Sequence, residues 1–166
     1  MSLALSVRAA DFASLDTSLL VLALPANATV DETLNALDRR AGGVLRRSLE
    51  RREFRGGRDE LLHLSSTTSG VERILLVGIG KSEDRVAALR RAAALAARQA
   101  GKLGVKRLAF FAAGLTEQEA EAAALGLIAG AWDFKELKTA PPAEDRRDAL
   151  EEAVVLAGTP GARSEE

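Results

Sequence analysis

The chain has 166 residues, of which 47% are hydrophobic and 28% are charged, with 23 Lys and Arg residues against 24 Asp and Glu. This length favours one domain with its own core, and the apolar fraction excludes a disordered chain. The near-neutral balance argues against a dedicated nucleic-acid-binding protein, which carries a strongly basic domain. The absence of cysteine excludes disulfides and thiolate chemistry, and the single histidine, His63, excludes a histidine-rich metal site.

The start of the chain shows no targeting signal. Its first ten residues lack the basic start and long apolar run of a secretory signal. The longest apolar stretch, Leu19–Ala26, is interrupted by Pro25 and is too short to span a bilayer. We therefore expect a cytoplasmic protein that makes no contact with a membrane.

The first half of the chain alternates strands with a broken helix. Apolar patterning predicts strands over residues 3–7, 19–24, 60–65 and 73–77. Asp31 suits the N-cap of a helix, which Gly42-Gly43 interrupts before it resumes at Val44. The uniformly apolar run at 73–77 is typical of a strand covered on both faces of a sheet.

The second half begins with a long amphipathic helix. Ser82 or Asp84 opens it, and Gly101 and Gly104 end it. Its apolar residues fall at steps of three and four and predict one buried stripe, formed by Val86, Leu89, Ala93, Ala96, Ala100 and Leu103.

Next come a strand over 107–111 and a helix opened by a capping box, Thr116 to Glu119. We expect that helix to bury Ala120, Ala124, Leu127 and Ile128. An aromatic exit segment (132–139), a charged connector (140–152) and a last strand (153–157) complete the predicted domain, residues 1–158. Residues 159–166 are predicted to begin a linker. This order predicts an α/β fold with a mostly parallel or mixed sheet between helical layers.

A glycine-rich turn follows the clearest strand. Gly78, Gly80, Lys81 and Ser82 are a candidate phosphate loop, since exposed amides at a helix start and a nearby lysine suit an anion. However, the Walker pattern requires glycine at the position of Leu75, and the dinucleotide pattern requires it at Glu83. The residues favour the alternative, a tight turn with a solvated lysine.

Arginines are concentrated between residues 39 and 58, where only Glu50 and Glu53 oppose them. The candidate surface for DNA or a protein partner comprises Arg46, Arg47, Arg51, Arg52, Arg55 and Arg58. Phe54 is the only aromatic residue among them, so base stacking is not indicated. A solvated face, or one that pairs with acidic partners in an assembly, explains the pattern better.

The remaining polar residues indicate no chemistry. His63 has no second histidine and is expected to be structural. Glu117, Glu119 and Glu121 lie at a helix start, where carboxylates complement the dipole. Trp132 and Phe134 are expected to seal a core edge. The sequence therefore offers no catalytic residue, no metal ligand and no cofactor of this chain.

Taken together, these elements resemble the amino-terminal domain of the leucyl aminopeptidase (cytosol aminopeptidase) family. The match is strongest at the strand and turn of residues 73–81, Arg-Ile-Leu-Leu-Val-Gly-Ile-Gly-Lys. Trp132 and Leu137 depart from it, standing where tyrosines are expected. The other matching positions are Leu37-Asp38, Gly42-Gly43, Leu45, Phe54, Gly56, Glu60, Leu62, Leu64, Leu89 to Ala92, Val105 to Arg107, Gly126, Phe134 and Lys138.

The resemblance implies a part of a metal-dependent exopeptidase that removes amino-terminal residues from peptides. It places two divalent metals, zinc or manganese, and the catalytic lysine and arginine in a separate carboxy-terminal domain. The signature of that domain, of the kind Asn-Thr-Asp-Ala-Glu-Gly-Arg, does not occur in this sequence. The resemblance also implies a macro-type α/β fold, with a mixed sheet of about six strands flanked by helices on both faces. It further implies a role in hexamer assembly with the catalytic domain and sister subunits and, as in some bacterial members, DNA binding.

These implications leave three hypotheses. The first is an accessory and assembly domain of an aminopeptidase, inactive alone and present here as an expressed fragment. The second is a stand-alone module that binds ADP-ribose or another nucleotide, and the third is a DNA-binding domain acting through the arginine-rich stretch.

Overall fold

The computed structural model describes residues 3–9, 11–12, 15–65, 70–81, 83–137 and 150–157. Its strands are β1 (Ala4–Arg8), β2 (Thr17–Pro25), β3 (Leu61–Ser65), β4 (Val71–Gly80), β5 (Arg107–Phe111) and β6 (Glu152–Leu156). Its helices are α1 (Glu32–Arg40), α2 (Val44–Glu50), α3 (Arg85–Leu103) and α4 (Glu117–Leu137). All the strands expected from the sequence are present. The predicted linker at 159–166 and most of the charged connector lie outside the described residues.

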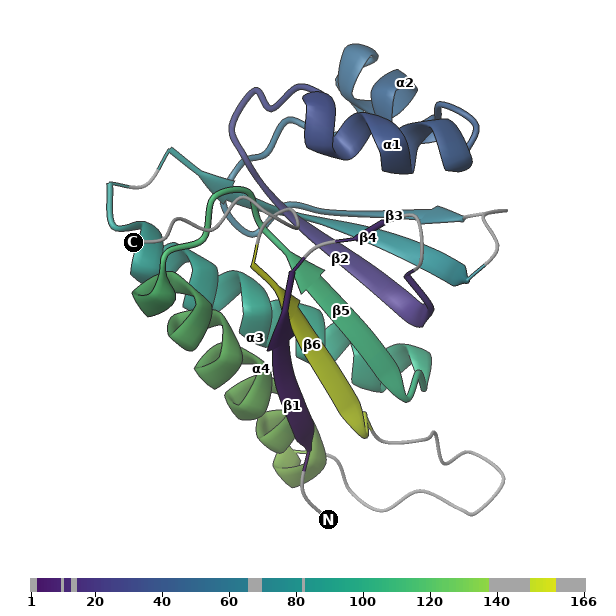
Figure 1. Cartoon of the computed structure of the whole chain (residues 1–166). Helices are drawn as coiled ribbons and strands as arrows, with labels where there is room; N and C mark the ends of the chain where they lie inside the picture. The colour runs from purple at the N-terminus through teal and green to yellow at the C-terminus, as the bar shows by residue number, and fades with distance from the viewer. Residues whose placement is uncertain are drawn as a thin grey trace.

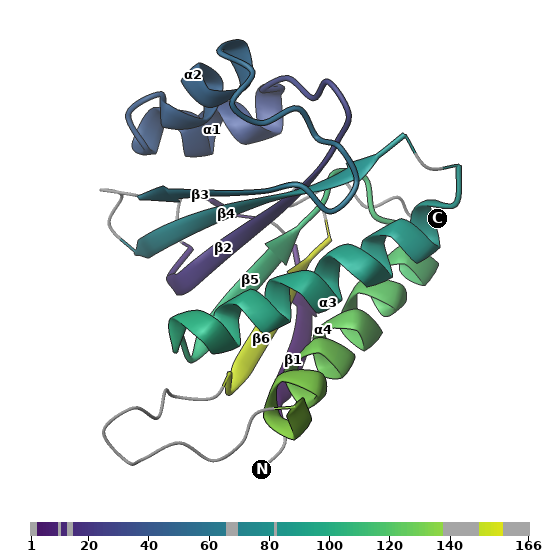
Figure 2. The same ribbon diagram turned by 180° about the vertical axis from the view of Figure 1, so that it is seen from behind.

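The six strands form one mixed sheet in the order β1-β6-β5-β2-β4-β3. Neighbouring strands are parallel except for β3, which runs antiparallel to β4. Helices α1 and α2 cover one face, over β2, β4 and β3, while α3 and α4 cover the other (Figures 1 and 2). The predicted α/β fold, with a mixed sheet between helices on both faces, is confirmed.

Strand β2 lies inside the sheet and supplies both cores. Leu19, Val21 and Ala23 face α3 and α4, whereas the alternating residues Leu20, Leu22 and Leu24 face α1 and α2. A continuous apolar run is required here because both faces of the strand are covered. The strand extends one residue further than predicted, through Pro25, after a register shift at the sheet's carboxyl edge.

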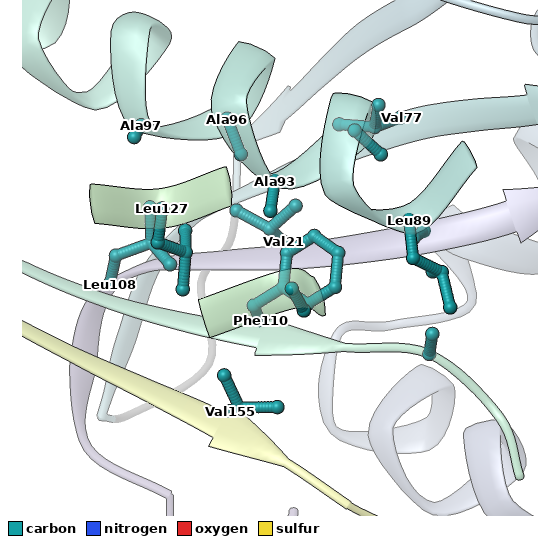
Figure 3. Packing of buried hydrophobic residues seen from close by; sticks show 14 of the residues in the cluster. Val21, Val77, Leu89, Ala93, Ala96, Ala97, Leu108, Phe110, Leu127 and Val155 are labelled. Carbon is teal, nitrogen blue, oxygen red and sulfur yellow. The ribbon is translucent and has the colours of Figure 1, made fainter. Parts of the chain in front are cut away.

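The larger core lies between the sheet and α3. Figure 3 shows Ala93 and Ala96 of α3 above Val21 and Phe110 of the sheet. Small side chains let the helix approach the sheet closely. Gly101, predicted to end the helix, is instead buried within it, and α3 ends at Gly104, which adopts the left-handed conformation that favours glycine.

Helix α4 is longer than the sequence indicated. The predicted capping box is confirmed: Thr116 Oγ1 accepts from the Glu119 amide, and Glu119 Oε1 accepts from the Thr116 amide, both at 3.1 Å. The helix continues through Trp132 to Leu137, so the predicted exit segment is wrong up to that residue. Ile128, predicted to be buried, is 46% exposed, because α3 and the sheet contact other sides of the helix.

The smaller core lies under α1 and α2. Asp31 caps α1 as predicted, accepting from the Leu34 amide at 2.9 Å. Gly42 and Gly43 separate the helices with positive φ values of 73° and 80°. Asp38, only 4% exposed, supplies the cap that Gly43 cannot, since its Oδ1 accepts from the first amides of α2 at 3.0 and 3.1 Å.

Two glycines let α4 contact the backbone of α3. A Cβ added at Gly126 would lie 2.2 Å from the Arg90 carbonyl oxygen, and one added at Gly130 would lie 2.3 Å from that of Ala94. Such distances are far below van der Waals contact. Any side chain at these positions would therefore push the helices apart.

We predict that Gly126→Ala lowers the free energy of unfolding by about 1–3 kcal/mol, because overpacking outweighs the higher helix propensity of alanine. Chemical denaturation of the variant measures the change. The control is Ala129→Gly on the exposed side of α4, which should cost about 1 kcal/mol of helix propensity alone. Stabilisation by Gly126→Ala would contradict the close approach.

Candidate functional site

The topology indicates two positions for a binding crevice, one on each side of β2, because β5 and β4 both lead to helices on the face opposite to α1 (Figure 1). In sheets of parallel strands, ligands bind beyond the carboxyl ends, where neighbouring strands continue to opposite faces. That condition holds between β2, which leads to α1, and β5, which leads to α4 (Figure 1). The loops at residues 26–31 and 112–116 therefore border the position between β2 and β5.

At the position shared by β2 and β5, side chains of this chain bind the backbone groups at the start of α4. Besides the capping box, Arg85 Nε lies 3.2 Å from Glu119 Oε1, and Arg85 also donates to the Ala113 carbonyl. A carboxylate thus already occupies the position where an anion would be attracted to the helix dipole. This geometry gives no support to a nucleotide site at the loop between β5 and α4.

The predicted phosphate turn begins inside β4, because Gly78 belongs to that strand and Gly80 is its last residue; only Lys81 and Ser82 fall in the connection to α3. The Gly78 amide donates to the Glu60 carbonyl, and the Gly80 amide donates to the Gly56 carbonyl, both at 2.8 Å. These two amides are therefore not free for a phosphate. Lys81 is exposed, and Ser82 lies outside the described residues.

A close contact with the backbone explains why residue 78 is glycine better than a bound ligand does. A Cβ added at Gly78 would lie 1.9 Å from the Gly57 carbonyl oxygen, so only glycine fits beneath the loop of residues 55–60. Glu60 fixes that loop by accepting from the amides of Arg55 and Gly57 at about 3 Å. Gly78 and Gly80, which follow the apolar run of β4, thus leave space for the loop that precedes β3 and form hydrogen bonds with it.

An ion pair fastens the same loop to α3. Asp59 accepts from Arg91 Nε and Nη2, each at 2.7 Å. Hydrogen bonding to Arg91 holds the pKa of the Asp59 carboxyl below its ordinary value, against partial burial, and the charges of Arg91 and Arg58 add to this effect. The charged pair therefore contributes stability only while Asp59 is ionised.

The structure divides the predicted arginine surface into two groups. Arg46 contacts Asp38 and Asn35, and Arg47 donates to the Gly42 carbonyl at 2.9 Å, so both brace the turn between α1 and α2. In the described part of the chain, the side chains of the others form no hydrogen bond or ion pair. These exposed arginines are Arg51, Arg52, Arg55 and Arg58.

One surface was missed by sequence reasoning. Leu125, Ile128 and Trp132 are 46%, 46% and 60% exposed and follow one another at steps of three and four along α4. We call these residues the α4 stripe. Trp132 does not seal a core edge as predicted. Because α4 is rich in apolar residues on every side, periodicity could not show which side faces solvent.

The other candidate groups remain dispersed. His63 is exposed on β3, on the face opposite to Leu62 and Leu64, as its register predicted. Among the described residues, no three His, Cys, Asp or Glu side chains are grouped so that they could hold a metal ion. No helix in the described part of the chain is long and apolar enough to cross a membrane.

The fold defines the class of protein. The Mycobacterium tuberculosis DarG macrodomain superposes with a TM-score of 0.59 at 13% identity, covering 93% of this chain and 99% of that one. A mutant of tomato leucine aminopeptidase superposes with a TM-score of 0.72 at 20% identity, covering 97% of this chain but 34% of that one. The chain thus has a macrodomain-like fold that also occurs as one part of a larger enzyme.

The sequence places it more narrowly. Residues 21–141 match the model for the N-terminal domain of the cytosol aminopeptidase family. A probable cytosol aminopeptidase from Geobacter sp. (strain M21) is 37% identical over 130 residues, which are 74% of this chain and 26% of the relative. The chain belongs to the cytosol aminopeptidase family as its N-terminal domain, and it spans about a quarter of that curated relative.

We predict that Asp59→Asn destabilises the domain at neutral pH and loses its effect in acid. The folded-state pKa of Asp59 is lowered, so the pair stabilises the fold above the ordinary aspartate pKa, and this contribution disappears as the pH falls through the lowered value. Denaturation midpoints of both proteins across the acid range measure it. Glu83→Gln, which removes an exposed charge without an ion pair in the described chain, is the control.

Proposed function

We propose that this chain is a non-catalytic accessory and assembly domain of a metal-dependent aminopeptidase, which as a whole removes amino-terminal residues from peptides. The observation that carries the proposal is the family match to an N-terminal domain, in a chain with one histidine and no cysteine. Peptide hydrolysis with two metals needs a cluster of ligands, and the described residues do not fit one.

The proposal assigns the chemistry to another part of the enzyme. Zinc or manganese ions and the catalytic side chains would belong to the portion that the relatives have beyond this chain's length. The partners of this domain would be that catalytic domain and sister subunits in a hexamer. The compartment would be the cytoplasm, in keeping with the name of the Geobacter relative.

The first test is hydrolysis of a leucyl anilide by the purified chain with added zinc or manganese. We expect no turnover above buffer, because no described cluster can activate a water. The Geobacter relative, assayed in parallel, is the positive control. Turnover that co-purifies with the intact chain would overturn the non-catalytic role.

The second test addresses assembly. Removing the matching region from the Geobacter relative should lower its oligomeric state in sedimentation while its remaining domain stays folded. If the truncated relative assembles as the full enzyme does, the assembly role fails.

Nucleic-acid binding is a second candidate function, favoured by the exposed arginines Arg51, Arg52, Arg55 and Arg58. Arg51 is the C-cap of α2 and Arg52 follows it, while the other two lie in the loop that crosses β4. Side chains that form no hydrogen bond or ion pair in the described part of the chain can approach phosphates without breaking one. The proposal needs only electrostatic contact, since the one aromatic residue among them, Phe54, is buried.

We predict that Arg51→Glu with Arg55→Glu weakens binding to duplex DNA at low salt by about tenfold or more and flattens its salt dependence. Fluorescence anisotropy over a salt series measures both. Lys102→Glu, a charge reversal at the exposed end of α3, is the matched control. Undetectable binding by the unmodified chain, or equal weakening by the control, would exclude this surface.

A further inference from the structure

Within the part of the chain that the structure describes, the outer edge of β1 is unpaired. The Ala4 amide donates to the Glu151 carbonyl, and the Arg8 carbonyl accepts from the Ala157 amide, so residues 4, 6 and 8 direct their backbone groups to β6. The alternating residues Leu5 and Val7 direct theirs outward. No strand of the described chain pairs with this edge. An unpaired edge of this kind is a template for another strand.

The α4 stripe flanks the same edge. Figures 1 and 2 agree that the carboxy-terminal half of α4 lies beside the start of β1. Leu5 packs into the core on that face, and Val7, which shares the face, is 55% exposed. Exposed apolar side chains of β1 and of α4 therefore lie on the same side of the sheet, without cover in the described structure.

The opposite face carries Arg8 and Glu152, and Arg107 of β5 lies opposite Glu152 in the register of the sheet. Arg8 and Glu152 form no ion pair or hydrogen bond through their side chains in the described chain. Glu152 is opposite Ala4 in the pairing of β1 with β6, and strand alternation puts its side chain on the same face as that of Arg8. Three residues of β1 separate Arg8 from Ala4, so the two charges do not meet within one copy.

We infer that this surface binds a second copy of the chain, with β1 pairing antiparallel to β1 about a two-fold axis at Ser6. Leu5 of each copy then opposes Val7 of the other, and the outward backbone groups of both residues form hydrogen bonds. The axis brings the two α4 stripes to the same side of a continuous sheet. Such an isologous contact closes on itself.

Charge complementarity selects this register. In this register, Arg8 lies opposite Ala4 of the second copy. Glu152 of that copy is the partner of Ala4 on the next strand, β6, and its side chain lies on the same face of the sheet as Arg8. Two inter-strand spacings separate their backbones, about 10 Å, which an arginine and a glutamate side chain together span across the small alanine. Symmetry repeats the pair. The inference rests on the proposed assembly role and names the surface that serves it.

The test is the oligomeric state of the chain, residues 1–166, by sedimentation equilibrium from micromolar to high micromolar concentration. We expect a dimer, in which hydrogen exchange shows the Leu5 and Val7 amides protected as concentration rises. Val7→Pro removes an amide that bonds nothing within one copy and is tolerated at an edge, so it should yield a folded monomer. A monomer at every concentration would overturn the inference.

A charge exchange keeps the inference falsifiable should the proline variant fail to fold. Arg8→Glu should raise the dimer dissociation constant about tenfold, and Arg8→Glu with Glu152→Arg should restore it to within about threefold. Lys81→Glu, an exposed reversal distant from β1, should change nothing. A dimer indifferent to these variants would use another surface. Neither failure touches the accessory role, which the hydrolysis assay and the truncated relative test separately.

Discussion

The double burial of β2 is the constraint on which the rest of the domain depends. Its apolar run from Leu19 to Leu24 is covered on both faces and paired along both edges, by β4 and β5. Each such side chain contributes about 1.5–3 kcal/mol when fully buried. The strand can keep this burial only if α1 and α2 remain on one face and α3 and α4 remain on the other. The positions of the loops at the sheet's carboxyl edge are fixed by this arrangement, because the loops connect its strands to these helices.

Much of this architecture could be predicted from local chemistry. Continuous apolar runs locate the buried strands, Asp31 and Thr116 locate helix starts, and Gly42-Gly43 separates α1 from α2. These signals work because each depends on a few neighbouring residues. The resemblance to the family added what periodicity could not, namely the mixed macro-type sheet.

The remainder depends on contacts between distant residues. Gly78 follows an apolar run and so suggested a ligand loop. Its lack of a side chain instead lets the backbone of residues 56 and 57 pass close to β4. The exposed side of α4 escaped prediction because an alanine-rich helix hides its orientation. Arg46 and Arg47 looked equivalent to Arg51 and Arg52 in sequence, yet only the first two stabilise the fold through Asp38, Asn35 and the Gly42 carbonyl.

The two glycines of α4 have a mechanical consequence. Gly126 and Gly130 bring the backbones of α3 and α4 into contact, so no side chain separates the two helices at these positions. The helices cannot slide or roll independently, and α3 is in turn bound to β2 and β4 by the larger core. The outer side of α4 is therefore connected to the centre of the sheet through closely packed elements. Whatever binds that side meets a rigid support, and little conformational entropy is lost on docking.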